Sequence, residues 1–134
     1  MMARRVGRRT PGDSLRTAMH ELSVAQSIVQ IALRNAGGRP VTRVELRVGH
    51  LRQVVSSSLY FAFEAVTAGT AAEGAELVVE QVPVAGECRA CGAEGLLGDL
   101  PLACAACGSR AVLITAGEEL SVEAIEVEDG RCTV

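Results

Sequence analysis

Four of the five cysteines form two short pairs, Cys88-Arg-Ala-Cys91 and Cys104-Ala-Ala-Cys107, which are separated by twelve residues. A CxxC turn brings two sulfurs within bonding distance of one ion, and two such turns complete a tetrahedron of thiolates. A glycine follows each pair and lets the backbone bend tightly there. The spacing predicts a zinc ribbon that holds Zn(II) on four cysteines, and a closed site of this kind is structural.

Two other uses of these cysteines fit the sequence less well than the zinc site. Thioredoxin-like redox chemistry would rest on a single CxxC beside a βαβ unit, and two matched pairs argue against it. Disulfides would require an oxidising compartment. The paired spacing, without an apolar signal segment, indicates a reduced and cytoplasmic protein. Cys132 has no partner in the sequence and is expected to be a free thiol on a frayed tail.

The two histidines and the acidic residues carry little chemical signal by themselves. A lone histidine is rarely a ligand, so His20 alone would be an exposed residue near a helix start, and His50 a surface residue in a turn. The carboxylates show no paired arrangement suited to acid–base catalysis. The sequence therefore predicts a protein that is not an enzyme.

Helical patterns on both sides of a strand indicate which elements position these groups. Ser23 and Gln26 form a predicted capping box that begins the first helix, and Gly37 ends it. Apolar residues recur at helical spacing between them, at Ala25, Ile28, Val29 and Ala32. A second helix is expected to begin at the serines of 56–58 and to end at Gly69. Its predicted apolar stripe consists of Leu59, Ala62, Phe63 and Val66.

Three segments have strand patterns. Apolar and charged residues alternate strictly over 41–48, which predicts a half-buried strand. Further strands are expected over 75–84 and 120–128. The alternation of the last one slips between Val122 and Ile125, which indicates a β-bulge.

These elements predict an α+β fold, with a small three-stranded sheet, two helices and an inserted four-cysteine zinc ribbon. The predicted divisions are a disordered extension over 1–18, an α/β domain over 19–86 and 111–130, and the zinc ribbon over 87–110. No apolar run approaches the roughly 20 residues of a membrane-spanning helix.

Charge is distributed unevenly along the chain. Residues 1–18 carry five arginines and one aspartate, whereas the remaining residues carry eight arginines and fifteen acids. A nucleic-acid-binding protein usually shows a basic face with stacking aromatics. The body of this chain is acidic and its aromatics are few, so neither nucleic acid nor a membrane is expected as a partner.

Several segments together resemble the HypA/HybF family of hydrogenase maturation proteins, which insert nickel. The resemblance begins at Met19-His20-Glu21 and covers residues 19–128. It includes both cysteine pairs and the following stretches: 19–29, Val48-Gly49, 61–70, 73–75 and 125–127. The Met-His-Glu motif alone is a weak indication of the family. The occurrence of this motif, the second-helix segment and the two CxxC pairs in this order is specific to it.

The resemblance implies a Ni(II) site at Met19, His20 and Glu21. In the family, the ligands are the amino terminus, backbone amides of the next residues and the imidazole, so Glu21 would contribute its backbone nitrogen. Square-planar nitrogen ligation suits Ni(II). Eighteen residues precede Met19 here, so a free amine exists only if the chain starts at Met19, which we expect. Otherwise the amine is lost, and His20 binds nickel weakly or together with other ligands.

The turn from Val54 to Ser58 departs from the family pattern, because it lacks an acidic residue that could add a ligand. The resemblance further implies a [NiFe] hydrogenase large subunit as the acceptor, a HypB-type GTPase as a partner, and homodimers. The alternative function is a zinc-ribbon protein-interaction adaptor without a nickel role.

Overall fold

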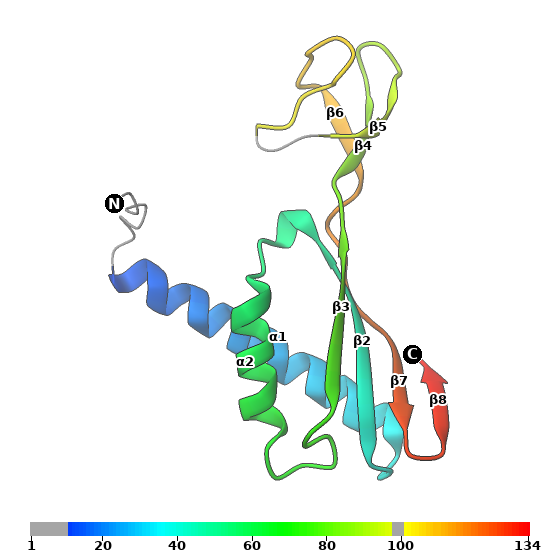
Figure 1. Ribbon diagram of the computed structural model, residues 1–134. Coiled ribbons are helices and arrows are strands. Elements are labelled where there is room, and N and C mark those ends of the chain that lie inside the picture. Colours follow the sequence, from blue (N-terminus) through cyan, green and yellow to red (C-terminus); the bar gives the residue numbers. More distant parts are fainter. Residues whose placement is uncertain (1–10, 98–100) are drawn as a thin grey trace.

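A computed structural model describes residues 11–97 and 101–134 of the chain. Two helices cover one face of a four-stranded sheet, and a smaller three-stranded sheet extends beyond one end of it (Figure 1). The helices are α1 (Pro11–Ala36), the short 3-10 helix η1 (His50–Arg52) and α2 (Ser56–Thr67). The strands are β2 (Val41–Gly49), β3 (Glu76–Val82), β4 (Ala85–Cys88), β5 (Glu94–Leu96), β6 (Val112–Ala116), β7 (Leu120–Val127) and β8 (Gly130–Thr133).

The large sheet has the strand order β3-β2-β7-β8. β2 and β3 are parallel and are connected through α2, whereas β2–β7 and β7–β8 are antiparallel. Along β7, Ala124 pairs with Glu45 and Val122 pairs with Leu46, so one residue of β7 is extra at this point. The predicted bulge is therefore confirmed, as is the α+β class.

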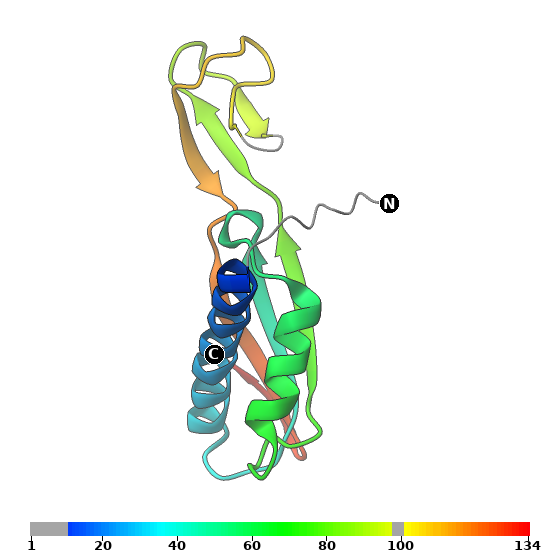
Figure 2. The same ribbon diagram turned by 90° about the vertical axis from the view of Figure 1, so that its left-hand side faces the viewer.

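The core lies between the two helices and the large sheet, and both helices are in front of that sheet in Figure 2. β2 directs its alternate residues Val44, Leu46 and Val48 inward, and all three are buried. The helical stripes meet them from the other side with Ala25, Ile28, Val29, Ala32, Leu59 and Phe63. The periodicity of the sequence thus assigned the buried faces correctly.

The first helix begins earlier than its capping signal predicted. Helix α1 starts at Pro11 and runs through Ser23, so the predicted helix start at a capping box there is wrong. Proline suits the first turn of a helix, and the good helix formers Leu15, Arg16, Ala18, Met19, Glu21 and Leu22 follow it before Ser23. Of the extension expected to be disordered, residues 11–18 are helical and residues 1–10 lie outside the described residues.

The C-terminal segment forms a fourth strand that the sequence did not predict. Residues of β8 pair with β7, from Gly130 opposite Val127 to Thr133 opposite Ala124. Cys132 packs against the core, and the Arg39 Nη2 donates a hydrogen bond to its Sγ over 3.3 Å. The expectation that Cys132 belongs to a frayed tail is wrong, because strand pairing orders this end of the chain.

The two sheets meet where the chain enters and leaves the small one. The linker of residues 117–119, which joins β6 to β7, passes directly over the end of β2. The Gly49 amide donates to the Glu119 carbonyl over 2.7 Å. A Cβ added to Gly49 would lie 2.1 Å from the carbonyl carbon of Gly117. Only glycine therefore allows the two backbones to approach this closely.

We expect Gly49→Ala to destabilise the fold by about 2–3 kcal/mol, because overpacking against backbone forces the linker away. The exposed Glu76→Ala should change the free energy of unfolding by about 0.5 kcal/mol or less. Urea denaturation of both variants measures the two changes. Equal stabilities would mean that the contact with the linker is not tight.

No helix in the part of the chain that the structure describes has both the length and the apolar character needed to cross a membrane.

Candidate metal sites

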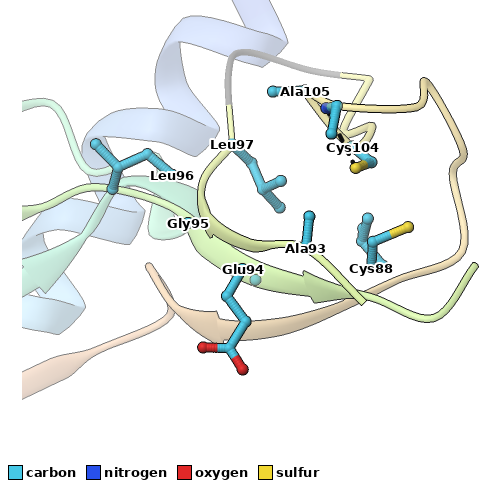
Figure 3. A pocket seen from close by; sticks show the side chains of 11 residues that line it. Cys88, Ala93, Glu94, Gly95, Leu96, Leu97, Cys104 and Ala105 are labelled. Carbon is cyan, nitrogen blue, oxygen red and sulfur yellow. Dashed lines mark hydrogen bonds between the residues drawn. The ribbon is translucent and has the colours of Figure 1, made fainter. Parts of the chain in front are cut away.

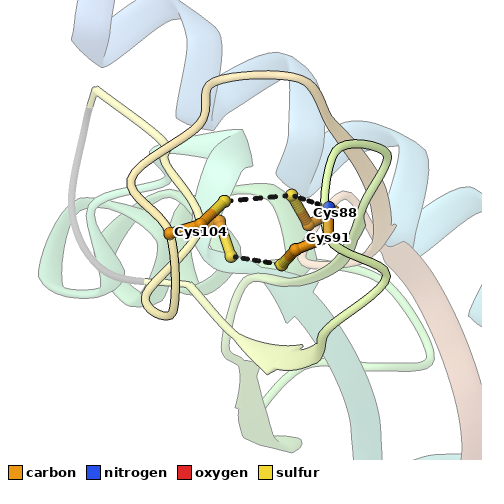
Figure 4. A group of neighbouring side chains, drawn as sticks. Cys88, Cys91 and Cys104 are labelled. Carbon is orange, nitrogen blue, oxygen red and sulfur yellow. Dashed lines mark hydrogen bonds between the residues drawn. The ribbon is translucent and has the colours of Figure 1, made fainter.

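The four paired cysteines converge at the tip of the small sheet (Figure 4). Cys88 ends β4, Cys91 lies in the turn that follows, and Cys104 and Cys107 lie in a turn before β6. Their sulfurs all lie within 4.8 Å of one another. Cys88 and Cys104 are buried, whereas Cys91 and Cys107 are exposed, so one side of the cluster faces solvent.

The two cysteine turns are built in the same way. The Ala90 amide donates to the Sγ of Cys88 over 3.3 Å, and the Ala106 amide donates to the Sγ of Cys104 over 3.3 Å. Each turn closes with a glycine at positive φ, whose amide donates to the carbonyl of the first cysteine: Gly92 to Cys88 over 2.8 Å, and Gly108 to Cys104 over 2.9 Å. These amides orient the thiolates before any metal binds.

The spacing of the sulfurs fits a tetrahedral ion. The Sγ atoms of Cys88 and Cys107 are 3.7 Å apart, and those of Cys91 and Cys104 are 3.6 Å apart. A tetrahedron with metal–sulfur bonds of about 2.3 Å, the length for zinc, has sulfurs about 3.8 Å apart. The cluster is therefore a four-cysteine metal site that leaves no position open for a substrate.

The protein environment divides the four thiols into two kinds. Hydrogen bonds from backbone amides, chiefly that of Cys91, lower the pKa of Cys88 to about 6. Backbone amides, chiefly that of Cys107, also lower the pKa of Cys104. The Ala93 amide lowers the pKa of Cys91, but contact with Cys104 and the other sulfurs outweighs this and raises it to about 11. The protein environment therefore favours the thiolate form at Cys88 and Cys104 and the thiol form at Cys91.

An apolar pocket of about 110 Å³ lies beside the two buried cysteines (Figure 3). Ala93, Leu96 and Leu97 contribute to its walls together with Cys88 and Cys104. Apolar surroundings limit the access of water to metal–thiolate bonds. The side of the metal site next to the pocket is therefore shielded from water, whereas Cys91 and Cys107 face solvent on the other side.

His20 lies far from the cysteines in the fold, on α1 beside the large sheet. Its side chain is exposed and lies on a groove of about 270 Å³. Ser23 and Ser27 follow on the same helix, and Leu120 and Ser121 of β7 form the opposite wall. The structure gathers the four cysteines as predicted, whereas it places no cysteine on this groove.

Glu21, the next residue, points the other way and is fully buried. Its Oε2 accepts a hydrogen bond from the Val55 amide over 2.9 Å, while its Oε1 is buried without a hydrogen-bond partner among the described residues. The carboxylate is thus enclosed in the fold and is not available on the surface for contact with a partner. Its backbone nitrogen remains the only atom of Glu21 that the nickel prediction requires.

The same contact explains how α2 begins. Val55 is the N-cap residue of α2 and has no side chain able to accept a hydrogen bond, so the predicted capping by serines 56–58 is wrong. Glu21 instead reaches the N-cap amide from another helix, as the glutamate of a capping box does within one helix. A carboxylate at a helix N-terminus is also favoured by the helix dipole. No sequence signal marks this long-range contact.

The backbone around Met19 bears on the nickel prediction. In an α-helix each interior amide donates to the carbonyl four residues earlier. Because α1 begins at Pro11, the amides of His20 and Glu21 are interior ones. In a helix that began at Met19 they would belong to the first turn, whose amides have no intrahelical partner.

Comparisons with known proteins identify relatives of this chain. A family model described as "Hydrogenase/urease nickel incorporation, metallochaperone, hypA" matches residues 19–127. The hydrogenase maturation factor HypA of Geobacter metallireducens is 46% identical over 110 residues, which are 82% of this chain and 100% of that protein. HypA of Geotalea uraniireducens is 47% identical over the same shares of both chains.

Solved structures show a similar fold. The solution structure of the Ni metallochaperone HypA from Helicobacter pylori is 24% identical, with a TM-score of 0.57 over 80% of this chain and 96% of that one. A second HypA solution structure is 25% identical, with a TM-score of 0.59 over 81% and 96% of the two chains. On the extent of the family match and the identity to its relatives, this chain belongs to the HypA family of nickel metallochaperones in hydrogenase maturation.

Proposed function

We propose that this protein binds one Ni(II) at Met19, His20 and Glu21 and delivers it to a [NiFe] hydrogenase large subunit during maturation. The observation that carries the proposal is the exposed His20 at the start of the family match, next to the buried and anchored Glu21. The imidazole is therefore accessible to a metal, while the following residue ties the segment to the fold.

Square-planar nickel would be held by the amine of Met19, the amides of His20 and Glu21, and the imidazole of His20. A first-turn segment supports this arrangement, because its amides are not needed by the helix. An open site at the edge of the fold also favours release of nickel over permanent retention. The protein itself performs no catalytic step and acts by carrying the ion.

Zinc is the metal proposed for the four cysteines. All-cysteine tetrahedral sites are typical of structural zinc, and the sulfur spacing fits that ion. Zinc bound there would stabilise the small sheet, whose strands are short. A HypB-type GTPase and a second copy of this chain are the other proposed partners.

A nickel titration of two zinc-loaded forms tests the proposal. The chain that begins at Met19 should bind one Ni(II), whereas the full chain should bind much more weakly, because its residue 19 has no free amine. Equal binding by both forms would mean that a group other than the amine of Met19 serves as the fourth ligand. Binding by neither form would refute the nickel site.

An interaction adaptor is the second candidate, and one observation favours it. Leu96 and Leu113 are exposed by 67% and 46% on the small sheet, and exposed apolar side chains are frequent at protein contacts. An adaptor would need the zinc site but not His20. The absence of nickel binding with retention of zinc would therefore favour this function.

A further inference from the structure

The buried carboxylate of Glu21 is the least satisfied charged group near the proposed nickel site. It is 0% exposed, yet within residues 11–97 and 101–134 one of its oxygens has a single donor, Val55, and the other has none. Buried polar atoms in folded proteins are nearly always hydrogen-bonded, and an exception calls for an explanation. An apolar residue of similar size would fill the same space without this cost.

The segment that Glu21 holds is held in turn by the linker of the small sheet. The Leu51 amide donates to the Gly117 carbonyl over 2.8 Å, and the Arg52 Nε donates to the Glu118 carbonyl over 2.8 Å. The Glu119 side chain stiffens this linker, because its Oε1 accepts the Gly117 amide over 2.8 Å. Residues 51–55 therefore connect Glu21 to residues 117–119 through hydrogen bonds.

The same linker, residues 117–119, also leads to the groove on which His20 lies. The linker continues directly into Leu120 and Ser121, which form the wall of the groove opposite α1. His20 lies on this groove next to Glu21 in the chain. Both walls of the groove thus belong to one continuous set of contacts that passes through Glu21, residues 51–55 and residues 117–119.

From this arrangement we propose that the Glu21 carboxylate is a positioning residue for metal binding at His20, acting through residues 51–55 and 117–119. The proposal rests on the nickel function proposed above. Glu21 fixes the rotation of α1 against the start of α2, and this rotation sets where the imidazole lies relative to the wall formed by β7. The linker sets the position of that wall. Loss of either contact should loosen the geometry at His20 without removing a ligand.

Glu21→Leu separates a positioning role from a purely structural one. The variant keeps the backbone nitrogen and the side-chain volume but loses the acceptor for the Val55 amide. A structural role predicts equal or higher stability with unchanged nickel affinity, because an apolar residue replaces a half-satisfied charge. The positioning role predicts nickel affinity about 10–100-fold lower, as for other groups that orient metal ligands. Zinc content should stay at one per chain.

Two further variants complete the series. Glu21→Gln keeps an oxygen that can accept from the Val55 amide, so it should restore most of the affinity. Glu64→Leu makes the same substitution as the test variant at an exposed carboxylate on α2 and should bind nickel like the unaltered protein. Titrations use the full chain and the form beginning at Met19, with the nickel absorption band as a second readout of ligand geometry.

Glu119→Ala tests the linker independently, including the case in which Glu21→Leu fails to fold. It removes the acceptor for the Gly117 amide without removing any proposed nickel ligand, and nickel affinity should fall several-fold while zinc is retained. If the unaltered protein binds nickel but Glu21→Leu or Glu119→Ala binds it equally well, the positioning proposal is overturned and the nickel function stands. If neither unaltered form binds nickel, both proposals are overturned.

Discussion

Cys88→Ala should release the metal from the four-cysteine site and unfold the small sheet. The sulfur of Cys88 lies 3.7 Å from that of Cys107 and is buried, so no other group can replace it. Binding of structural zinc supplies on the order of 10 kcal/mol or more of folding free energy to such sites. The strands β4, β5 and β6 are too short to remain paired without it. Metal analysis and NMR of residues 85–116 measure both effects.

The fifth cysteine is the matched control. Cys132→Ala removes a thiol that lies in β8, outside the cluster, and should keep one zinc per chain with an intact small sheet. A Cys88→Ala protein that still held one zinc tightly would contradict the four-cysteine assignment. Loss of zinc from both variants would instead indicate that Cys132 supports the site indirectly.

Zinc binding should also depend on pH in a defined direction. Metal ligands must be deprotonated, so zinc affinity falls as the pH falls. The pKa values of Cys91 and Cys107 are raised above that of an ordinary thiol, so these two thiols are protonated at neutral pH before zinc binds. Binding should therefore release about two or more protons per zinc at neutral pH, which calorimetry in buffers of different ionisation enthalpy measures.

His20→Ala should abolish nickel binding in the form that begins at Met19 and leave the fold intact. The imidazole is exposed and packs into no core, so its loss should not change stability measurably. Replacing groups that merely orient a ligand costs about 10–100-fold in metal affinity, and removing a ligand should exceed this range. A competition titration against a chromophoric chelator measures the loss.

His50→Ala provides the comparison for this experiment. His50 is the other histidine of the chain, is exposed and begins η1, outside the groove that His20 lines. Its replacement should leave one nickel bound per chain. An unchanged titration after His20→Ala would refute the nickel assignment, and a loss only after His50→Ala would move the site to η1.

The main secondary structure was predictable wherever a local pattern was strong. The alternation over 41–48 placed β2 and its buried face, and the helical stripes placed the inner faces of α1 and α2. The bulge in β7 was visible as a slip in that alternation. These features repeat with the period of the strand or helix itself, so a few consecutive residues suffice to reveal them.

The sequence predicted less accurately where the helices begin and whether a last strand forms. A capping box at Ser23 and capping serines at 56–58 are present in the sequence, but α1 extends past the first and a glutamate from another helix replaces the second. β8 was not predicted, because its four residues, Gly130–Thr133, show no alternation of apolar and polar side chains. Its pairing with β7 supplies the order that its sequence does not indicate.

The sequence by itself determined the four-cysteine metal site and the family, because a CxxC turn chelates through neighbours in the chain and the family segments are contiguous. The tertiary structure alone decided what surrounds His20. Glu21 and Val55 are 34 residues apart, and Gly49 meets Gly117 only because the two sheets join there. Such contacts depend on how whole elements pack, and this packing leaves no periodic trace in the residues that make them.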